Sequence, residues 1–210
     1  MAKLTFYHAA PSRSSIVHWM LEELGQPYDV HLVSFKKGEN LKPEYLAINP
    51  MGKVPAIKHG DTVITEAAAI CTYPADEFAQ AKLNIPVGNP ARGVYLKWLF
   101  FGPSCLEPAI LDRAYPRKEP MPRSAAGFAD FETVMTVLAQ ATGAANPYLM
   151  GNQFTAADVI IGSGLRWATM FKLIPERPEF TAYLGRLGER PALKRVIEKD
   201  AKLQAEQERT

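Results

Sequence analysis

The sequence has little cysteine, little net charge and no long apolar run, and each shortage excludes a class of protein. Its 210 residues include two cysteines, Cys71 and Cys105, which lie far apart in unlike contexts. They form neither a disulfide framework nor a metal-ligand spacing, so we expect a protein of the reducing cytoplasm. The formal net charge is +2 with acids and bases interspersed, which argues against nucleic-acid or membrane-surface partners.

Long apolar segments and paired metal ligands are missing as well. No run approaches the roughly 18 apolar residues of a membrane span, and we expect no signal peptide. The histidines have no ligand spacing and no evident acidic partner, so neither a metal nor a cofactor is expected; they are His8, His18, His31 and His59. Because 47% of the residues are hydrophobic, the chain can bury a substantial core in one large or two modest domains.

The first eighty residues combine strand and helix patterns. Strand, helix and strand within about thirty residues predict a right-handed parallel crossover, and His59-Gly60-Asp61 then predicts a hairpin. Pro74 falls inside the last helix and should kink it. The order is therefore βαβ followed by ββα. The expected strands are residues 4–7, 28–35, 54–57 and 62–65, and the expected helices are 14–24, 43–48 and 67–79.

The rest of the chain is helical in pattern. Residues 80–90 carry two prolines and a glycine and are interpreted as a linker. Thr155 and Asp158 form a capping-box signal in front of a buried helix. The last helix is charged, and we expect it to fray into solvent. The expected helices are residues 91–111 with a break at Gly102-Pro103, 124–142, 159–171, 177–189 and 192–207.

Pro55 stands inside a short apolar run, where a central strand has no place for it because proline donates no ladder hydrogen bond. Either the proline begins an edge strand with a trans bond, or the Val54-Pro55 bond is cis. Eleven residues later Glu66 opens a helix, where free N–H groups and the positive dipole end suit a ligand carboxylate. Glu66 could equally complement the dipole of its own helix.

Together, Asn-Pro-Met-Gly-Lys-Val-Pro-Ala at residues 49–56 and the acidic residue that opens the next helix resemble the glutathione-binding half of the glutathione transferase family, of the bacterial cytosolic type. The resemblance implies an α/β thioredoxin-like domain at residues 1–79, a linker at 80–90 and an all-α domain at 91–210. It also implies a homodimer, glutathione as co-substrate, and a detoxifying role.

The same resemblance assigns the glutathione contacts. The bond into Pro55 is cis, and the backbone of Val54 pairs with the cysteinyl part of glutathione. Glu66 and the N–H of Ala67 hold the γ-glutamyl end, although the family usually has Ser at the second position. Lys53 meets the glycyl carboxylate or is solvated, and Arg13 meets an anionic ligand or forms a salt bridge.

A hydroxyl near the first helix should favour the glutathione thiolate, which is the nucleophile. Family classes use Tyr, Ser or Cys in this region, and the sequence offers Ser12, Ser14 and Tyr7. The Ser12-Arg13 pair matches several microbial members, so Ser12 is preferred. N-capping would explain the serines and sheet packing the tyrosine. A small apolar electrophile is expected, with plausible pocket walls at Ala9, Ala10, Phe101, Cys105 and Leu106.

Two other functions stay open. A family member without catalysis would be a ligand carrier or a protein-interaction module, and the absence of Ser at position 67 favours this alternative. Glutathione-dependent isomerisation, dehalogenation or peroxide reduction is a third possibility. The isomerase subgroup has a Ser-Ser-Cys loop, and a disulfide reductase would carry a loop cysteine. This loop reads Pro11-Ser12-Arg13 instead, which argues against both reactions.

Overall fold

The computed structural model describes residues 3–119 and 121–209 and divides into two compact units. The first consists of Met1–Ala81 with Arg190–Thr210, and the second is Lys82–Glu189. The predicted domains placed everything after residue 91 in one helical domain. The structure differs at this point, because the C-terminal helix belongs with the first unit.

A four-stranded sheet forms the centre of the first unit, in the order β2-β1-β3-β4. Its strands are β1 Leu4–His8, β2 Asp29–Leu32, β3 Ala56–His59 and β4 Thr62–Thr65. β1 is parallel to β2, and the remaining pairs are antiparallel. The parallel pair and the hairpin confirm the predicted βαβ and ββα order. The helices of this half are α1 Ser15–Leu24, α2 Pro43–Leu46 and α3 Ala67–Glu77, with short 3₁₀ segments η1 Glu39–Leu41 and η2 Ala79–Ala81.

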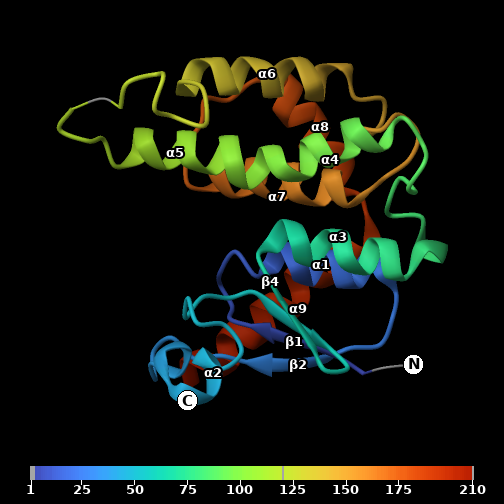
Figure 1. Cartoon of the computed structure of the whole chain (residues 1–210), viewed down its shortest axis with the longest axis vertical. Coiled ribbons are helices and arrows are strands. Elements are labelled where there is room, and N and C mark those ends of the chain that lie inside the picture. The colour runs from blue at the N-terminus through green and yellow to red at the C-terminus, as the bar shows by residue number, and fades with distance from the viewer. Residues whose placement is uncertain (1–2, 120, 210) are drawn as a thin grey trace. The chain divides into compact units, whose positions relative to one another are not determined.

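The core of this unit lies where α1 and α3, which run side by side, meet the sheet (Figure 1). Phe6 and Ile57 come from the sheet, Trp19 and Met20 from α1, and Ile70 from α3, and all are at most 2% exposed. α1 ends at Gly25, whose left-handed φ of 67° lets its N–H return to the carbonyl of Leu21.

Helix α9, Pro191–Arg209, packs against α1 of the same unit. Leu193 and Val196 are buried, and ion pairs join the two helices on the polar side. Arg190, the residue just before α9, reaches Glu23 at 2.6 Å, and Arg195 of α9 reaches Glu22 at 2.8 Å. The prediction that this helix frays into solvent was therefore wrong. Its high charge is used to bind α1 rather than to solvate the helix.

Within its described residues, the second unit holds helices and two isolated β-bridges but no named strand. The predicted break at Gly102-Pro103 is confirmed as a π-helical segment, η3 Gly102–Leu106, because proline has no N–H to continue the α-helical ladder. The helices are α4 Arg92–Phe101, α5 Glu107–Ala114, α6 Phe131–Ala144, α7 Ala156–Met170 and α8 Pro178–Gly188.

Two of the helix starts in this unit, those of α7 and α6, test the capping arguments. Helix α7 begins as predicted, since the N–H of Thr155 donates to the Asp158 carboxylate at 3.0 Å. The helix predicted for residues 124–142 begins later than expected, at Phe131. Asp130 caps it by accepting the N–H of Thr133 at 3.0 Å, and this cap had not been recognised in the sequence. No helix among the described residues is long and apolar enough to cross a membrane.

Candidate functional site

The loop between β1 and α1 brings two of the three predicted hydroxyl donors together. The Oγ atoms of Ser12 and Ser14 lie 2.6 Å apart. Both are placed to donate to the carbonyl of Ala9, at 2.6 and 3.0 Å, and the N–H of Ser14 donates to Ser12 Oγ at 3.0 Å. Ser14 is fully buried, whereas Ser12 is partly accessible at the start of α1. Of the two serines, only Ser12 is thus open to a ligand.

A buried polar cluster lies directly behind these serines. The Nδ1 atom of His8 is 2.6 Å from Ser14 Oγ, and its Nε2 atom is 3.1 Å from Asp200 Oδ1. The same carboxylate lies 2.5 Å from His18 Nδ1 and accepts the hydroxyl of Ser15. Burial would raise the pKa of Asp200, but the bonds from His18, His8 and Ser15 outweigh it and hold that pKa well below its ordinary value.

Sequence reasoning missed this cluster because its acid comes from α9, 192 positions after His8. The only signal in the sequence was the alternation of residues between the two faces of β1. Phe6 and His8 share the face of the strand that meets α1, and the rings of His8 and His18 have centroids 5.2 Å apart. A histidine on the buried face of a strand requires a polar partner, and that partner could not be located without the fold.

Tyr7 lies on the opposite face of β1. Its ring packs against Tyr45 of α2 and His31 of β2, with centroid separations of 6.0 and 5.1 Å. The structure therefore brings Ser12 and Ser14 together but leaves the third candidate donor on the other side of the sheet.

The Val54-Pro55 bond is cis, as the family resemblance implied. The preceding loop is fixed by polar contacts: the Tyr45 hydroxyl and the Asn49 amide donate to the carbonyl of Lys53 at 2.6 and 2.8 Å. Among the described residues, we find no hydrogen bond to the backbone of Val54. Its N–H and C=O can accordingly pair with an extended ligand, while the Lys53 side chain is exposed.

Glu66 opens α3 as predicted, with an unusual backbone. Its φ is 68°, in the left-handed region that non-glycine residues rarely adopt, and its side chain makes no cap hydrogen bond to its own helix in the part of the chain described. Glu66 is exposed, and the N–H groups of the first turn after it, beginning with Ala67, have no partner inside the helix.

The strand register carries these three segments to one end of the sheet. Tyr7 pairs with Ala56, and Ala56 pairs in turn with Thr65. The serine loop follows β1, the cis-proline loop precedes β3, and Glu66 follows β4. Because all three lie just beyond one row of paired residues, they surround a common region.

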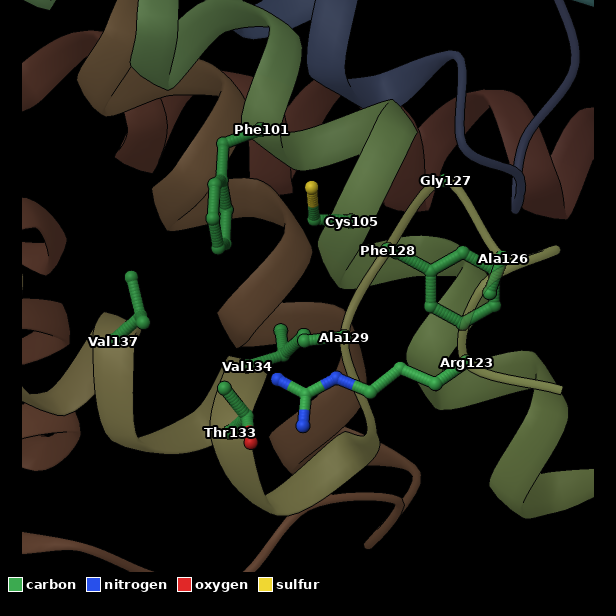
Figure 2. Close-up of a pocket in the computed structure, with 10 residues that line it drawn as sticks. All are labelled: Phe101, Cys105, Arg123, Ala126, Gly127, Phe128, Ala129, Thr133, Val134 and Val137. Atoms are coloured by element: carbon green, nitrogen blue, oxygen red, sulfur yellow. The ribbon is translucent and has the colours of Figure 1, made fainter.

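A cavity of about 330 Å³ lies in the second unit (Figure 2). Phe101 and Cys105 face it, and the Arg123 side chain extends across it toward Thr133 of α6. Burial raises the pKa of the Cys105 thiol, which keeps it protonated. The other walls are apolar or small and comprise Ala126, Gly127, Phe128, Ala129, Val134 and Val137.

Known proteins resemble this chain over most of its length. Residues 12–77 match the family model for the glutathione S-transferase N-terminal domain. Glutathione S-transferase A of Pleuronectes platessa is 31% identical over 188 residues, covering 83% of this chain and 82% of the relative. The chain belongs to the glutathione S-transferase family. The glutathione S-transferase GstA of Escherichia coli O157:H7 is similar too, at 30% identity over 93% of this chain and 96% of the relative.

The fold of this glutathione S-transferase family member matches solved structures along nearly its whole length. The glutathione transferase URE2P6 from Phanerochaete chrysosporium, in complex with oxidized glutathione, superposes with a TM-score of 0.77 at 27% identity. The match covers 96% of this chain and 98% of that chain. The thioredoxin-like unit and the helical unit are thus those of the family.

The residues predicted to line the electrophile pocket of this family member do not all lie at one cavity. Phe101 and Cys105 line the cavity of the second unit, while Leu106 is 1% exposed and belongs to that unit's core. Ala9 and Ala10 are buried in the first unit, at 3% and 7% exposure. Cys71 is completely buried and lies in the core, as its position on the apolar side of α3 predicted.

One group of side chains among the described residues could hold a metal ion. Ligand atoms of His8, His18 and Asp200 all lie within 4.8 Å of one another. The same atoms are also satisfied by hydrogen bonds between each histidine and the carboxylate. The expectation that the protein needs no metal or cofactor stays a prediction, which metal analysis of the purified protein would check.

Proposed function

We propose that this protein conjugates glutathione to small apolar electrophiles, with Ser12 as the residue that favours the thiolate. The observation that carries the proposal is the strand register, which places the serine loop, the Val54-Pro55 segment and Glu66 at one end of the sheet. Each segment offers what one part of glutathione requires.

The proposed binding mode uses backbone and charge together. The free backbone groups of Val54, ahead of Pro55, pair with the cysteinyl residue as an added antiparallel strand would. Glu66 binds the γ-glutamyl ammonium, and the open N–H of Ala67 binds the neighbouring carboxylate. Lys53 is exposed and can meet the glycyl carboxylate. Arg13 follows Ser12 in the same loop and adds positive charge to it.

The chemistry depends on lowering the pKa of the bound thiol. A free thiol titrates near pH 8.5, so little thiolate is present at neutral pH. The hydroxyl of Ser12 donates to the sulfur, and the N-terminus of α1 adds the favourable dipole. Lowering the thiol pKa by about two units requires about 2.7 kcal/mol of preferential thiolate stabilisation.

The electrophile is proposed to be small and apolar. The cavity of the second unit, lined by Phe101, Cys105 and two valines of α6, supports an apolar ligand of modest size. Among the described residues that line the cavity, Arg123 alone carries a charge. Variants that narrow the cavity, such as Val137→Phe, should raise KM for the electrophile and leave KM for glutathione unchanged.

Family membership also supports a homodimer, a cytoplasmic location and a detoxifying role, and we include them in the proposal. Light scattering coupled to gel filtration would show twice the monomer mass of 23.3 kDa if the dimer forms. A monomeric mass at micromolar concentration would remove that part of the proposal without affecting the site.

Ser12→Ala tests the central assignment. We expect the dissociation constant for glutathione, measured by calorimetry, to stay within about threefold of wild type. The rate of conjugation to an aryl halide should fall roughly 10²- to 10³-fold, which is the usual loss when one hydrogen-bond donor to a reacting anion is removed. Thr62→Ala is the matched control, because it removes an exposed hydroxyl at the far end of the sheet, where Thr62 pairs with His59.

Two results would contradict the proposal. Full conjugation by Ser12→Ala would show that another group favours the thiolate. Failure of the wild-type protein to bind glutathione at millimolar concentration would remove the transferase function, and would favour a carrier or interaction module on the same fold.

A further inference from the structure

The cavity of the second unit combines apolar walls with a guanidinium group. Its apolar side chains include Phe101, Phe128, Val134 and Val137. Arg123 comes from the loop between α5 and α6, and its side chain extends across the cavity (Figure 2). The volume of about 330 Å³ lies near the lower end of the range for ligand pockets, roughly 300–1,000 Å³. The cavity therefore has room for one substituted ring between aromatic and aliphatic walls.

Arg123 differs from the two arginines that precede it in the chain. Arg113 is paired with Glu132 at 3.2 Å, and Arg117 is paired with Asp112 at 3.0 Å. Within the described part of the chain, Arg123 forms neither a hydrogen bond nor an ion pair. A guanidinium carries five N–H donors in a planar fork and remains charged at every pH at which the protein is folded. These donors are consequently available to a ligand that enters the cavity.

Asp130 is a carboxylate whose charge interacts with Arg123, but its oxygens are already in use. They accept the N–H of Thr133 at 3.0 Å and its hydroxyl at 2.8 Å. These bonds, with a smaller contribution from the charge of Arg123, hold the pKa of Asp130 below its ordinary value. Asp130 is also exposed, so water screens its attraction for the guanidinium. The carboxylate caps α6 and leaves the donors of Arg123 unoccupied.

The remaining polar groups of the cavity do not oppose an anion. Burial raises the pKa of the Cys105 thiol, which stays neutral at pH 7 and does not repel negative charge. The hydroxyl of Thr133 donates to Asp130 rather than into the cavity. A cation would meet the charge of Arg123 with no carboxylate among the described lining residues to offset it. The lining thus selects an apolar body that carries an anionic group.

We propose that this cavity binds aromatic electrophiles that carry a carboxylate, with the ring against the apolar walls and the carboxylate on the guanidinium of Arg123. The inference rests on the proposed function and deepens it, because it names the class of electrophile. A carboxylate accepts two parallel N–H bonds from a guanidinium, which fixes the orientation of the ring. Because Arg123 is exposed and solvent screens the pair, we expect a contribution of about tenfold to affinity.

A matched pair of aryl chlorides tests this selection. One is a chloronitrobenzoate with its chlorine para to the carboxylate, and the other is the corresponding carboxamide, which has nearly the same size but no charge. In both reactions the glutathione thiolate forms a C–S bond, and chloride leaves with the electron pair of the C–Cl bond. We measure the ratio of kcat/KM for the carboxylate to kcat/KM for the amide. Comparing this ratio between variants removes the difference in intrinsic reactivity between the two compounds.

Three variants separate the guanidinium from general charge. Arg123→Gln should lower the ratio about tenfold, mainly through KM for the carboxylate. Arg123→Lys keeps the charge without the fork, and the ratio should stay within about threefold of wild type. Lys118→Gln is the matched control, because it removes a positive charge from an exposed position of the same loop that does not line the cavity. An unchanged ratio in Arg123→Gln, or an equal fall in Lys118→Gln, would overturn the inference.

Binding without reaction provides an independent test. The methyl analogues of the two compounds, in which a methyl group replaces the chlorine, have no leaving group and cannot be conjugated. By calorimetry, the wild-type protein should bind the methylnitrobenzoate about tenfold more tightly than its amide. Val137→Phe narrows the cavity and should weaken the binding of both. Equal affinity for the two analogues, or no effect of Val137→Phe, would overturn the inference.

The outcomes distinguish this inference from the proposed function. If the wild-type protein conjugates the carboxamide but the ratio does not respond to Arg123→Gln, the anionic selection is overturned and the transferase function stands. If neither chloride is conjugated, the proposed function fails, and the calorimetric comparison alone decides whether the cavity selects an anion. Thermal unfolding identifies any variant that fails to fold, and the comparison of the two analogues on the wild-type protein does not depend on the variants.

Discussion

Glu22 connects α1 to the helix that supplies Asp200, and its removal should destabilise the first unit in a pH-dependent way. The side chain is 7% exposed and is bonded to Lys199 at 2.5 Å and Arg195 at 2.8 Å. Burial would raise its pKa, but the bonds from Lys199, Tyr28 and Arg195 outweigh burial and lower the pKa from 4.5 to about 2. Glu22→Gln keeps the shape and removes the charge.

The magnitude follows from this pKa. The full difference between the folded and unfolded pKa values corresponds to an upper limit of about 3 kcal/mol. Lys199 and Arg195 are 48% and 49% exposed, so solvent screens the attraction strongly. We therefore expect Glu22→Gln to lower the free energy of unfolding by about 1–2 kcal/mol at pH 7.

The sign of the pH dependence is fixed, because the folded pKa lies below the unfolded one. The contribution of Glu22 is complete above about pH 4.5 and is lost as the pH falls toward 2. Urea unfolding followed by circular dichroism should show the full difference between variant and wild type at pH 7 and about a quarter of it at pH 2.5, just above the folded pKa of about 2. Glu198→Gln, at an exposed position of α9, is the control and should change little at either pH. An equal loss at both pH values would refute the reasoning.

Four further predictions concern packing and the glutathione site. Gly102→Ala should destabilise the second unit by about 1–3 kcal/mol in thermal unfolding, because its Cβ would lie 2.4 Å from Ile160 Cγ2; Gly185→Ala, with open space in α8, should stabilise by about 0.5–1 kcal/mol. Ala67→Ser should lower KM for glutathione about fivefold, since it adds one hydroxyl bond to a charged ligand; an unchanged KM would place the γ-glutamyl end elsewhere. Tyr7→Phe should leave conjugation rates unchanged, since Tyr7 lies on the other face of the sheet from Ser12, and a tenfold loss would reverse the assignment of the donor.

The fold was largely predictable because its signals are local. The helix start at Thr155 is specified by a side chain three residues away, and the break at Gly102 follows from the missing N–H of Pro103. The helix predicted to begin at Ser124 shows the limit of this approach, because periodicity continued through a segment that packs irregularly. The cap at Asp130 would have corrected the boundary.

The polar cluster could not be predicted because its members are distant in the chain. His8 and Asp200 are 192 positions apart, and no spacing rule connects a strand residue to a residue of the last helix. The high charge of the last helix predicts a solvated element, whereas Arg195 of α9 and the preceding Arg190 form ion pairs with α1. The serine loop was predicted as the donor region, but which groups support those serines depends on tertiary packing.

A crystal structure with bound glutathione tests the central assignment most directly. We expect the sulfur within about 3.2 Å of Ser12 Oγ, with the cysteinyl backbone paired to Val54 and the γ-glutamyl end at Glu66. A sulfur atom on the Tyr7 face of the sheet, or glutathione bound away from the Val54-Pro55 segment, would contradict the account.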